Sequence, residues 1–334
     1  MNVPKGIALL LWPLSAVYGA AAKVRAWLYA RGWLKQKRLK GTVISVGNIT
    51  VGGTGKTPMV IWLAEKFLAE GKRVAILSRG YKSAGGRSDE IELMKHRLCG
   101  KALFGVGKNR YAAARPLEEQ GIEIFLLDDG FQHLPLARDF DIVLIDRLQP
   151  LSEEKVLPAG RLREPLSALN RADAVVYTRT DGAKTTVGLI QQLKRFPIFP
   201  ASTQVQGFRL FGADEKLQSV AEISEGPFFA FCGIGNPEAF FLDLKRWGAK
   251  IAGQRAFRDH HRYTPAEMLA IEEAAQRAGA SALVTTEKDF YNLAGIGGTR
   301  MPLYICVITL AVPDEKQFLG AIAAKLGQRE GVVA

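Results

Sequence analysis

Cysteine is scarce in this sequence. Its 334 residues include only three cysteines, which are odd in number, far apart and without a C-x-x-C pair: Cys99, Cys232 and Cys306. This pattern excludes a fold held together by disulfides and a cysteine-rich metal site. We therefore predict free thiols in a reducing compartment. The length is sufficient for two domains, each with its own core.

Acidic residues are also in the minority. The 33 Asp and Glu stand against 45 Lys and Arg, which gives a formal net charge of +12. Such a charge favours phosphates, anionic lipid surfaces or nucleic acid as partners. The sequence contains no RNP motif, zinc-finger spacing, internal repeat or low-complexity tract. Nucleic acid is therefore the least supported of the three partners, and we predict none.

A glycine-rich segment lies between an apolar run, Thr42 to Val46, and a helical pattern, Met59 to Ala69. It departs from the G-x-x-x-x-G-K-[ST] template at Thr50, where the template has glycine. Its glycines allow backbone N–H groups to face a polyphosphate, Lys56 supplies a positive charge, and the Thr57 hydroxyl can bind Mg²⁺. An ordinary strand-to-helix loop is the alternative. We predict a nucleoside triphosphate site formed by Asn48, Thr50, Val51, Gly52, Gly53, Thr54, Gly55, Lys56 and Thr57.

Long hydrophobic runs are absent. The uncharged run Ile7 to Ala22 is shorter than the roughly 20 apolar residues of a spanning helix and is interrupted by Pro13. A basic and aromatic segment, Lys23 to Lys40, follows it. A signal peptide is one interpretation, but export would separate a phosphate-binding loop from its cytosolic ligand. A helix packed in a core is another. We favour a helix in the membrane interface, with Lys and Arg at an anionic leaflet.

Short apolar runs alternate with helical stretches after the glycine-rich loop. They predict an α/β fold with a parallel, P-loop NTPase-type sheet and helices on both faces. The expected strands are Arg73–Ser78, Ile122–Asp128, Ile142–Asp146 and Ala174–Thr178.

A segment with alternating residues, Gln204 to Phe211, predicts a connecting β-ribbon to a second, smaller α/β unit. The second unit is expected to contain strand Phe228–Cys232, helices Pro237–Trp247 and Pro265–Ala278, and strands Ala282–Thr285 and Leu303–Ile308. We predict an N-terminal interface segment at 1–40, a P-loop domain at 41–200, a linker ribbon at 201–226 and a C-terminal domain at 227–334.

Two carboxylates, Asp128 and Asp129, end the apolar run that begins at Ile124. A P-loop enzyme delivers an aspartate to the Mg²⁺ shell from such a position. The following residues, Gly130 to His133, add polar groups at the carboxyl end of the sheet, where ligands bind in open α/β folds. An aspartate that only caps the next helix is the alternative.

Several motifs together resemble the tetraacyldisaccharide 4'-kinase family, the lipid A 4'-kinases of Gram-negative bacteria. They occur in order along nearly the whole chain: Val46–Thr57, Ser78–Tyr81, Asp128–His133, Leu157–Gly160, Leu162–Pro165, Arg171–Asp173, Phe257–His261 and Thr286–Asp289. The resemblance implies Mg·ATP as phosphoryl donor and a tetraacylated glucosamine disaccharide 1-phosphate as acceptor, with lipid IVA as product. It also implies a peripheral or monotopic enzyme on the cytoplasmic face of the bacterial inner membrane, with no obligate protein partner.

The resemblance also implies roles for individual residues. Asp89, acting with His260 and beside Asp259, would be the base that takes the proton of the acceptor hydroxyl, and Lys56 would act on the transferred phosphate. One member of the Asp89–His260 pair would lie on each domain. The substrate residues would be Arg79, Tyr81, Arg110, Gln132, His133 and Arg163, and the metal residues would be Thr57, Asp128, Asp129 and Glu164.

One departure from the family concerns the segment around Asp89. The family usually has Gly-Asp-Glu-Pro, and this chain has Ser88-Asp89-Glu90-Ile91.

Two other functions remain open at this point. One is a membrane-associated P-loop ATPase switch, although the early lysine of a deviant P-loop is absent at Val51. The other is a P-loop kinase with a soluble acceptor, which the amino-terminal segment disfavours.

Overall fold

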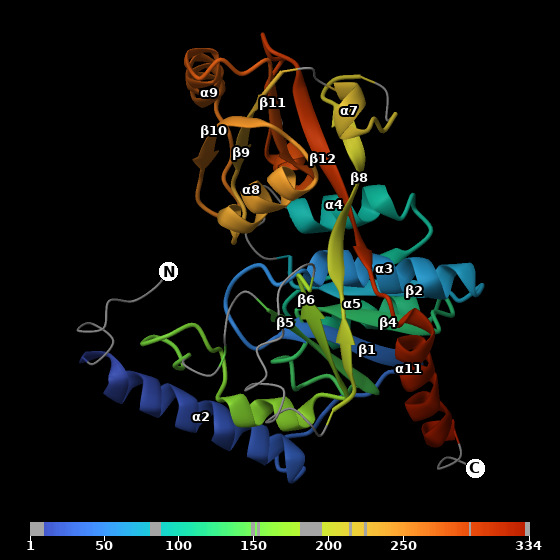
Figure 1. The fold of residues 1–334 in the computed structure, drawn as a ribbon. Helices are drawn as coiled ribbons and strands as arrows, with labels where there is room; N and C mark the ends of the chain where they lie inside the picture. The colour runs from blue at the N-terminus through green and yellow to red at the C-terminus, as the bar shows by residue number, and fades with distance from the viewer. Residues whose placement is uncertain are drawn as a thin grey trace. The chain divides into compact units, whose positions relative to one another are not determined.

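The computed structural model describes residues 10–80, 88–147, 151, 154–180, 196–213, 216–223, 226–293 and 295–330. The chain divides into two compact units. The first comprises residues 1–79, 98–202 and 310–334, and the second comprises residues 80–97 and 203–309. Each unit is built around its own sheet (Figure 1).

The first unit contains a seven-stranded sheet with the order β3-β2-β4-β1-β5-β6-β7, in which all neighbouring strands are parallel. The central strands are buried apart from Thr42 at the start of β1, as expected for a parallel sheet covered on both faces. The strands are β1 (Thr42–Asn48), β2 (Val74–Ser78), β3 (Leu103–Val106), β4 (Ile124–Asp128), β5 (Phe140–Asp146), β6 (Ala174–Thr178) and β7 (Ile198–Pro200).

Two crossover helices cover opposite faces of this sheet. Helix α3 (Lys56–Ala69) connects β1 to β2, and α5 (Arg110–Glu118) connects β3 to β4, in the opposite direction along the sheet. Because parallel crossovers are right-handed, opposite directions place their helices on opposite faces. The 3-10 helix η2 (Leu166–Arg171) precedes β6, and α11 (Glu315–Glu330) is the last helix of this unit (Figure 1).

Helix α2 (Trp12–Ala30) exposes most of its large apolar side chains. Only Ser15 and Gly19 are buried in it: the Ser15 hydroxyl accepts a hydrogen bond from the Ala159 amide, and Gly19 lies against Pro165. The narrow contact surface does not fit the interpretation of a helix packed in a core. No helix within the described part of the chain has the length and apolar character to span a bilayer.

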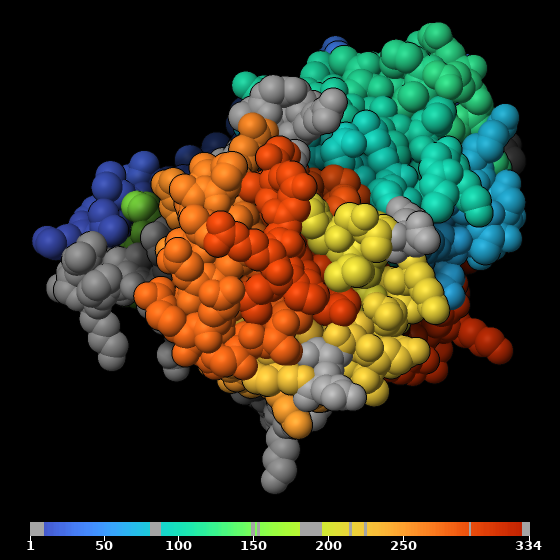
Figure 2. Space-filling model, turned by 90° about the horizontal axis from the view of Figure 1, so that it is seen from above, coloured from blue at the N-terminus to red at the C-terminus, as the bar shows by residue number. Residues whose placement is uncertain are grey.

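The second unit contains a five-stranded sheet with the order β10-β9-β11-β12-β8. Its strands are β8 (Ser202–Leu210), β9 (Phe228–Cys232), β10 (Ile251–Ala256), β11 (Ala282–Thr286) and β12 (Leu303–Ala311). Its helices are α4 (Asp89–Arg97), α7 (Val220–Ile223), α8 (Pro237–Arg246), α9 (Pro265–Arg277), α10 (Glu287–Phe290) and the 3-10 helix η3 (Tyr291–Leu293). Figure 2 shows residues of α8 to β12, in orange and red, forming one continuous face of this unit.

Strands β8 and β12 carry the chain between the two units, and β8, an edge strand of the second sheet, lies in the segment predicted as a connecting ribbon. Most predicted elements are present with ends shifted by a few residues. The predicted capping box at Thr264 and Glu267 begins α9, with Pro265 in its first turn. The strands β3, β7 and β10 were not predicted, because three to six residues are too few to give a clear periodic signal.

Candidate functional site

The glycine-rich loop lies at the carboxyl end of β1, in the middle of the first sheet. Gly55 has φ 88° and Gly52 has φ 120°, values that side-chain-bearing residues rarely adopt. A Cβ on Gly47 would lie 2.6 Å from the Phe131 Cβ, so this strand end requires glycine too. These conformations turn the backbone sharply ahead of the amino terminus of α3, where orphan N–H groups bind anions.

Contacts from two other segments hold the loop in place. The Asn48 side-chain amide donates to the Gly52 carbonyl at 3.3 Å and to the Thr54 hydroxyl at 3.0 Å. The Val51 amide donates to the Arg161 carbonyl, and the Gln132 side chain donates to the Asn48 carbonyl. These hydrogen bonds therefore fix the backbone of the loop.

Lys56 and Arg163 meet at one carboxylate. The Arg163 guanidinium donates to both oxygens of Asp129 at 2.8 Å, and Lys56 Nζ lies 3.6 Å from Asp129 Oδ1. Burial opposes ionisation of Asp129, but the two cations outweigh it and lower the pKa of this carboxyl. Asp129 also has φ 50°, a left-handed conformation that directs it out of the strand end. The structure thus places a charged triad beside the phosphate-binding loop.

The predicted metal residues lie in different surroundings. Asp128 is buried at the end of β4 and accepts a hydrogen bond from the Ser78 hydroxyl at 3.1 Å. Thr57 is in the first turn of α3. The Glu164 carboxylate pairs with Arg171 at 2.5 Å. Within the described residues, no group of three or more His, Cys, Asp or Glu side chains could hold a metal ion. A Mg²⁺ ion held by one or two carboxylates plus phosphate oxygens still fits this donor set.

Several cations surround His133 in the first unit. Burial, together with Arg110, Arg138, Arg25 and Arg79, lowers the pKa of His133 to about 4, so the imidazole is neutral at physiological pH. Arg110 itself is 5% exposed, and among the described residues its Nε has no hydrogen-bond partner. Such a buried guanidinium atom is suited to an anionic ligand. Tyr81, another predicted substrate residue, lies outside the described residues.

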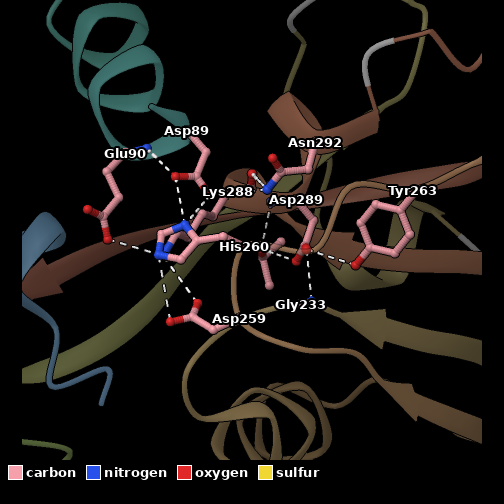
Figure 3. Close-up of polar contacts among 10 residues, drawn as sticks. Asp89, Glu90, Gly233, Asp259, His260, Tyr263, Lys288, Asp289 and Asn292 are labelled. Carbon is pink, nitrogen blue, oxygen red and sulfur yellow. Dashed lines mark hydrogen bonds and ion pairs between the residues drawn. The ribbon is translucent and has the colours of Figure 1, made fainter. Parts of the chain in front are cut away.

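The second unit brings Asp89 and His260 together (Figure 3). His260 Nδ1 lies 3.0 Å and 2.9 Å from the two carboxylate oxygens of Asp89, although the residues are 171 positions apart. Asp89 is the first residue of α4, and it also accepts hydrogen bonds from the Asn292 side chain and the Glu90 amide. The departure at Ser88 to Ile91 therefore leaves Asp89 beside His260.

The surroundings keep Asp89 ionised. Burial opposes its ionisation, but the hydrogen bond from His260 and the charge of Lys288 outweigh burial and lower the pKa of the carboxyl. Asp259 is close by: its Oδ2 lies 3.7 Å from His260 Nε2. An ionised carboxylate held in place by an imidazole can act as a general base.

The prediction that the pair has one member on each domain is wrong. Residues 80–97 belong to the second compact unit, together with His260. Helix α4 is attached there because Arg97 forms an ion pair with Glu287 of α10 at 3.0 Å and donates to the Ile308 carbonyl. A segment inserted between two strands of the first sheet thus folds with the second unit, which sequence order could not indicate.

Sequence reasoning also missed the residues that support His260. The buried Asp289 accepts hydrogen bonds from the Gly233 amide and the Tyr263 hydroxyl, both at 2.8 Å. The Gly233 carbonyl in turn accepts the His260 amide. This chain of contacts holds His260 in a left-handed backbone conformation, with φ 60°. The motif Thr286–Asp289 pointed to this region without indicating a role.

Comparisons with known proteins agree with these observations. The profile of the family described as tetraacyldisaccharide-1-P 4'-kinase matches residues 7–327. A tetraacyldisaccharide 4'-kinase of Geobacter metallireducens is 38% identical over 95% of this chain and 97% of its own length. One from Geobacter sulfurreducens is 39% identical over 90% of this chain and 88% of its own length.

A solved structure supports the same assignment. The "apo" form of LpxK from Aquifex aeolicus, in complex with ATP, is 31% identical, with a TM-score of 0.73 over 96% of this chain and 99% of that one. The resemblance predicted from the sequence motifs is thereby confirmed. This chain belongs to the tetraacyldisaccharide-1-phosphate 4'-kinase family.

Proposed function

We propose that this protein transfers the γ-phosphoryl group of ATP to the 4'-hydroxyl of a tetraacylated glucosamine disaccharide 1-phosphate. Family membership carries the proposal, because the profile and the curated relatives all cover most of the chain. The product would be the lipid A precursor lipid IVA. The local geometry supports a kinase, since one unit holds a phosphate-binding loop and the other holds an ionised carboxylate beside an imidazole.

The first unit supplies the groups that bind and neutralise the triphosphate. Backbone N–H groups of the loop and the amino terminus of α3 cradle phosphate oxygens. Lys56 places its ammonium on the β/γ-phosphates, and Asp129 and Arg163 keep that side chain in position. A Mg²⁺ ion held by Thr57 and Asp128 or Asp129 would supply additional charge neutralisation of the phosphates.

The second unit supplies the base. Asp89, oriented by His260, takes the proton from the 4'-hydroxyl as its oxygen forms a bond to the γ-phosphorus and the bond from that phosphorus to the bridging oxygen of ADP breaks. The lowered pKa of Asp89 keeps the carboxylate ionised well below neutral pH. In the first unit, the guanidinium groups around His133 would bind an anionic group of the acceptor.

The exposed apolar side chains of α2 support a place at the surface of the inner membrane, on the cytoplasmic face. Trp12 is 60% exposed, Leu14 60% and Val17 69%. Apolar residues and Trp in a helix with basic neighbours insert at the headgroup boundary, where the lipid acceptor resides.

An assay of phosphoryl transfer tests the reaction. Purified full-length protein in detergent should transfer the labelled γ-phosphate of ATP to a lipid disaccharide 1-phosphate, and should not label the 4'-deoxy analogue. Equal labelling of the two lipids would contradict the choice of the 4'-hydroxyl. ATP hydrolysis without transfer to lipid would instead indicate an ATPase switch.

A matched pair of variants tests the membrane surface. The double variant L14E/V17E should bind anionic vesicles more weakly and raise the KM for the lipid at least severalfold, with little change in the KM for ATP, because only the acceptor resides in the bilayer. The control L242E changes a leucine of α8 that is 54% exposed, and it should behave like the unchanged protein. Unaltered vesicle binding by L14E/V17E would place the membrane surface elsewhere.

A further inference from the structure

Lys288 occupies a central position among the polar side chains around His260 (Figure 3). Its Nζ lies 3.1 Å from Glu90 Oε1, 3.5 Å from Asp259 Oδ1 and 3.5 Å from His260 Nε2. The side chain is 18% exposed. Burial opposes its charge, but Glu90, Asp259 and Asp89 outweigh burial and raise the pKa of Lys288, so the ammonium is permanently charged.

The two nitrogens of His260 therefore face different partners. Nδ1 lies within hydrogen-bond distance of both Asp89 oxygens, which can only accept when the carboxylate is ionised. Nε2 faces the Lys288 ammonium, which can only donate. Asp259 Oδ2 lies 3.7 Å from Nε2, slightly farther than the Lys288 ammonium. The nearest partner of each nitrogen is matched by a ring with a proton on Nδ1 and a lone pair on Nε2.

We propose that Lys288 is a positioning residue of the phosphoryl-acceptor base. Its ammonium holds His260 in the neutral tautomer that donates from Nδ1 to Asp89, and so keeps that carboxylate unprotonated and oriented. This role rests on the proposed function of Asp89 and His260.

The groups around the ring come from three elements besides its own loop. Asp89 and Glu90 come from α4, Lys288 from α10 and Asn292 from η3, while Asp259 precedes His260 in the loop. An N–H on Nε2 would face the Lys288 ammonium, which itself can only donate. The ammonium also contacts the carboxylates of Glu90 and Asp259, at 3.1 Å and 3.5 Å.

The tautomer can be observed directly. In ¹⁵N-histidine-labelled full-length protein at pH 7, we expect a His260 signal of the neutral form with Nε2 as the unprotonated nitrogen, assigned by its loss in His260→Asn. A neutral form with the proton on Nε2, or an imidazolium, would overturn the proposal even if phosphoryl transfer is normal. This measurement requires no activity and no Lys288 variant, so it separates the failure of this inference from the failure of the proposed reaction.

The pH dependence of turnover gives a second test. Lys288→Met removes a cation that lowers the pKa of Asp89. Protonation of this carboxylate becomes easier, so the acidic limb of the kcat profile should move up by about one pH unit. Lys288→Arg keeps the positive charge and should return the acidic limb close to its wild-type position. The control Lys95→Met, at a 50% exposed lysine of α4, should leave the profile unchanged. A uniform fall in kcat without movement of the limb would mean that Lys288 only supports the fold, and would overturn the proposal.

Discussion

The phosphate-binding loop of the first unit and the Asp89–His260 cluster of the second unit are built in opposite ways. The loop consists of consecutive residues whose backbone supplies most of the donors, and the backbone angles of Gly52 and Gly55 require glycine. The cluster consists of side chains from α4, α10, η3 and a loop, brought together by long-range contacts. A change in the loop should therefore act locally, whereas a change in the cluster should spread to residues that touch no substrate.

The electrostatics of the two places differ as well. Near the loop, the single carboxylate of Asp129 pairs with two cations, Lys56 and Arg163. Because one negative charge cannot neutralise two positive charges, positive charge remains for a phosphate. In the cluster, one cation, Lys288, contacts the carboxylates of Glu90 and Asp259 and lies 3.5 Å from His260 Nε2. The first arrangement is suited to binding an anion and the second to holding a base in its ionised form.

The largest effect is expected at Lys56. Lys56→Ala removes a preorganised charge from the transferring phosphate, so kcat should fall on the order of 10³-fold or more. The thermal melt should stay unchanged, because Asp129 retains Arg163 and no packed side chain is lost. Near-normal turnover of a folded variant would mean that the loop does not bind the nucleotide.

The next effect concerns the pair in the second unit. Asp89→Ala and His260→Ala should each lower kcat by about two to four orders of magnitude, the range for losing general-base assistance. If the two act as one unit, the double variant should be little worse than the worse single variant. A double-variant loss equal to the product of the single losses would indicate independent roles.

Asp289 tests whether the cluster depends on residues outside it. Asp289→Ala leaves the buried Gly233 amide and Tyr263 hydroxyl without their acceptor, which should cost roughly 2 to 4 kcal/mol in the free energy of unfolding. Turnover should fall too, since Gly233 holds the His260 amide. Tyr263→Phe removes only one of these donors and should cost about 1 kcal/mol in a denaturant melt. Wild-type turnover in Asp289→Ala would show that the Gly233 contact does not position His260.

The smallest effect concerns His133 in the first unit. Its pKa is lowered from 6.5 to about 4, so the unfolded chain takes up a proton between these values while the folded protein does not. The difference in the free energy of unfolding between the wild type and His133→Gln should therefore be constant above pH 6.5. As the pH falls to about 4, the wild type should lose stability relative to the variant. Since the imidazole is partly exposed, the loss should be about 1 kcal/mol. Chemical denaturation of both proteins at pH 4 and 7 measures this loss. If the difference in the free energy of unfolding between the two proteins does not change with pH, the cationic surroundings do not lower the pKa of His133.

Local residue patterns were sufficient for the phosphate-binding loop, the capping box at Thr264, the main buried strands and the family. These features depend on residues close together in the chain, where backbone angles, caps and hydrophobic periodicity act directly. The motifs also identified Asp89 and His260, but only through resemblance to the family. The shifts of up to three residues at the ends of strands reflect hydrogen bonds to neighbouring strands, which a single segment does not contain.

Only the tertiary structure decided which unit carries Asp89 and which residues surround His260. Helix α4 belongs to the second unit because Arg97 pairs with Glu287, a residue 190 positions later in the chain. Lys288, Asn292 and Asp289 acquire their roles in the same way, through contacts that link α10 and η3 to distant segments. Local sequence specifies backbone conformation, whereas the partners of a buried charge are set by packing between segments that are far apart in the chain.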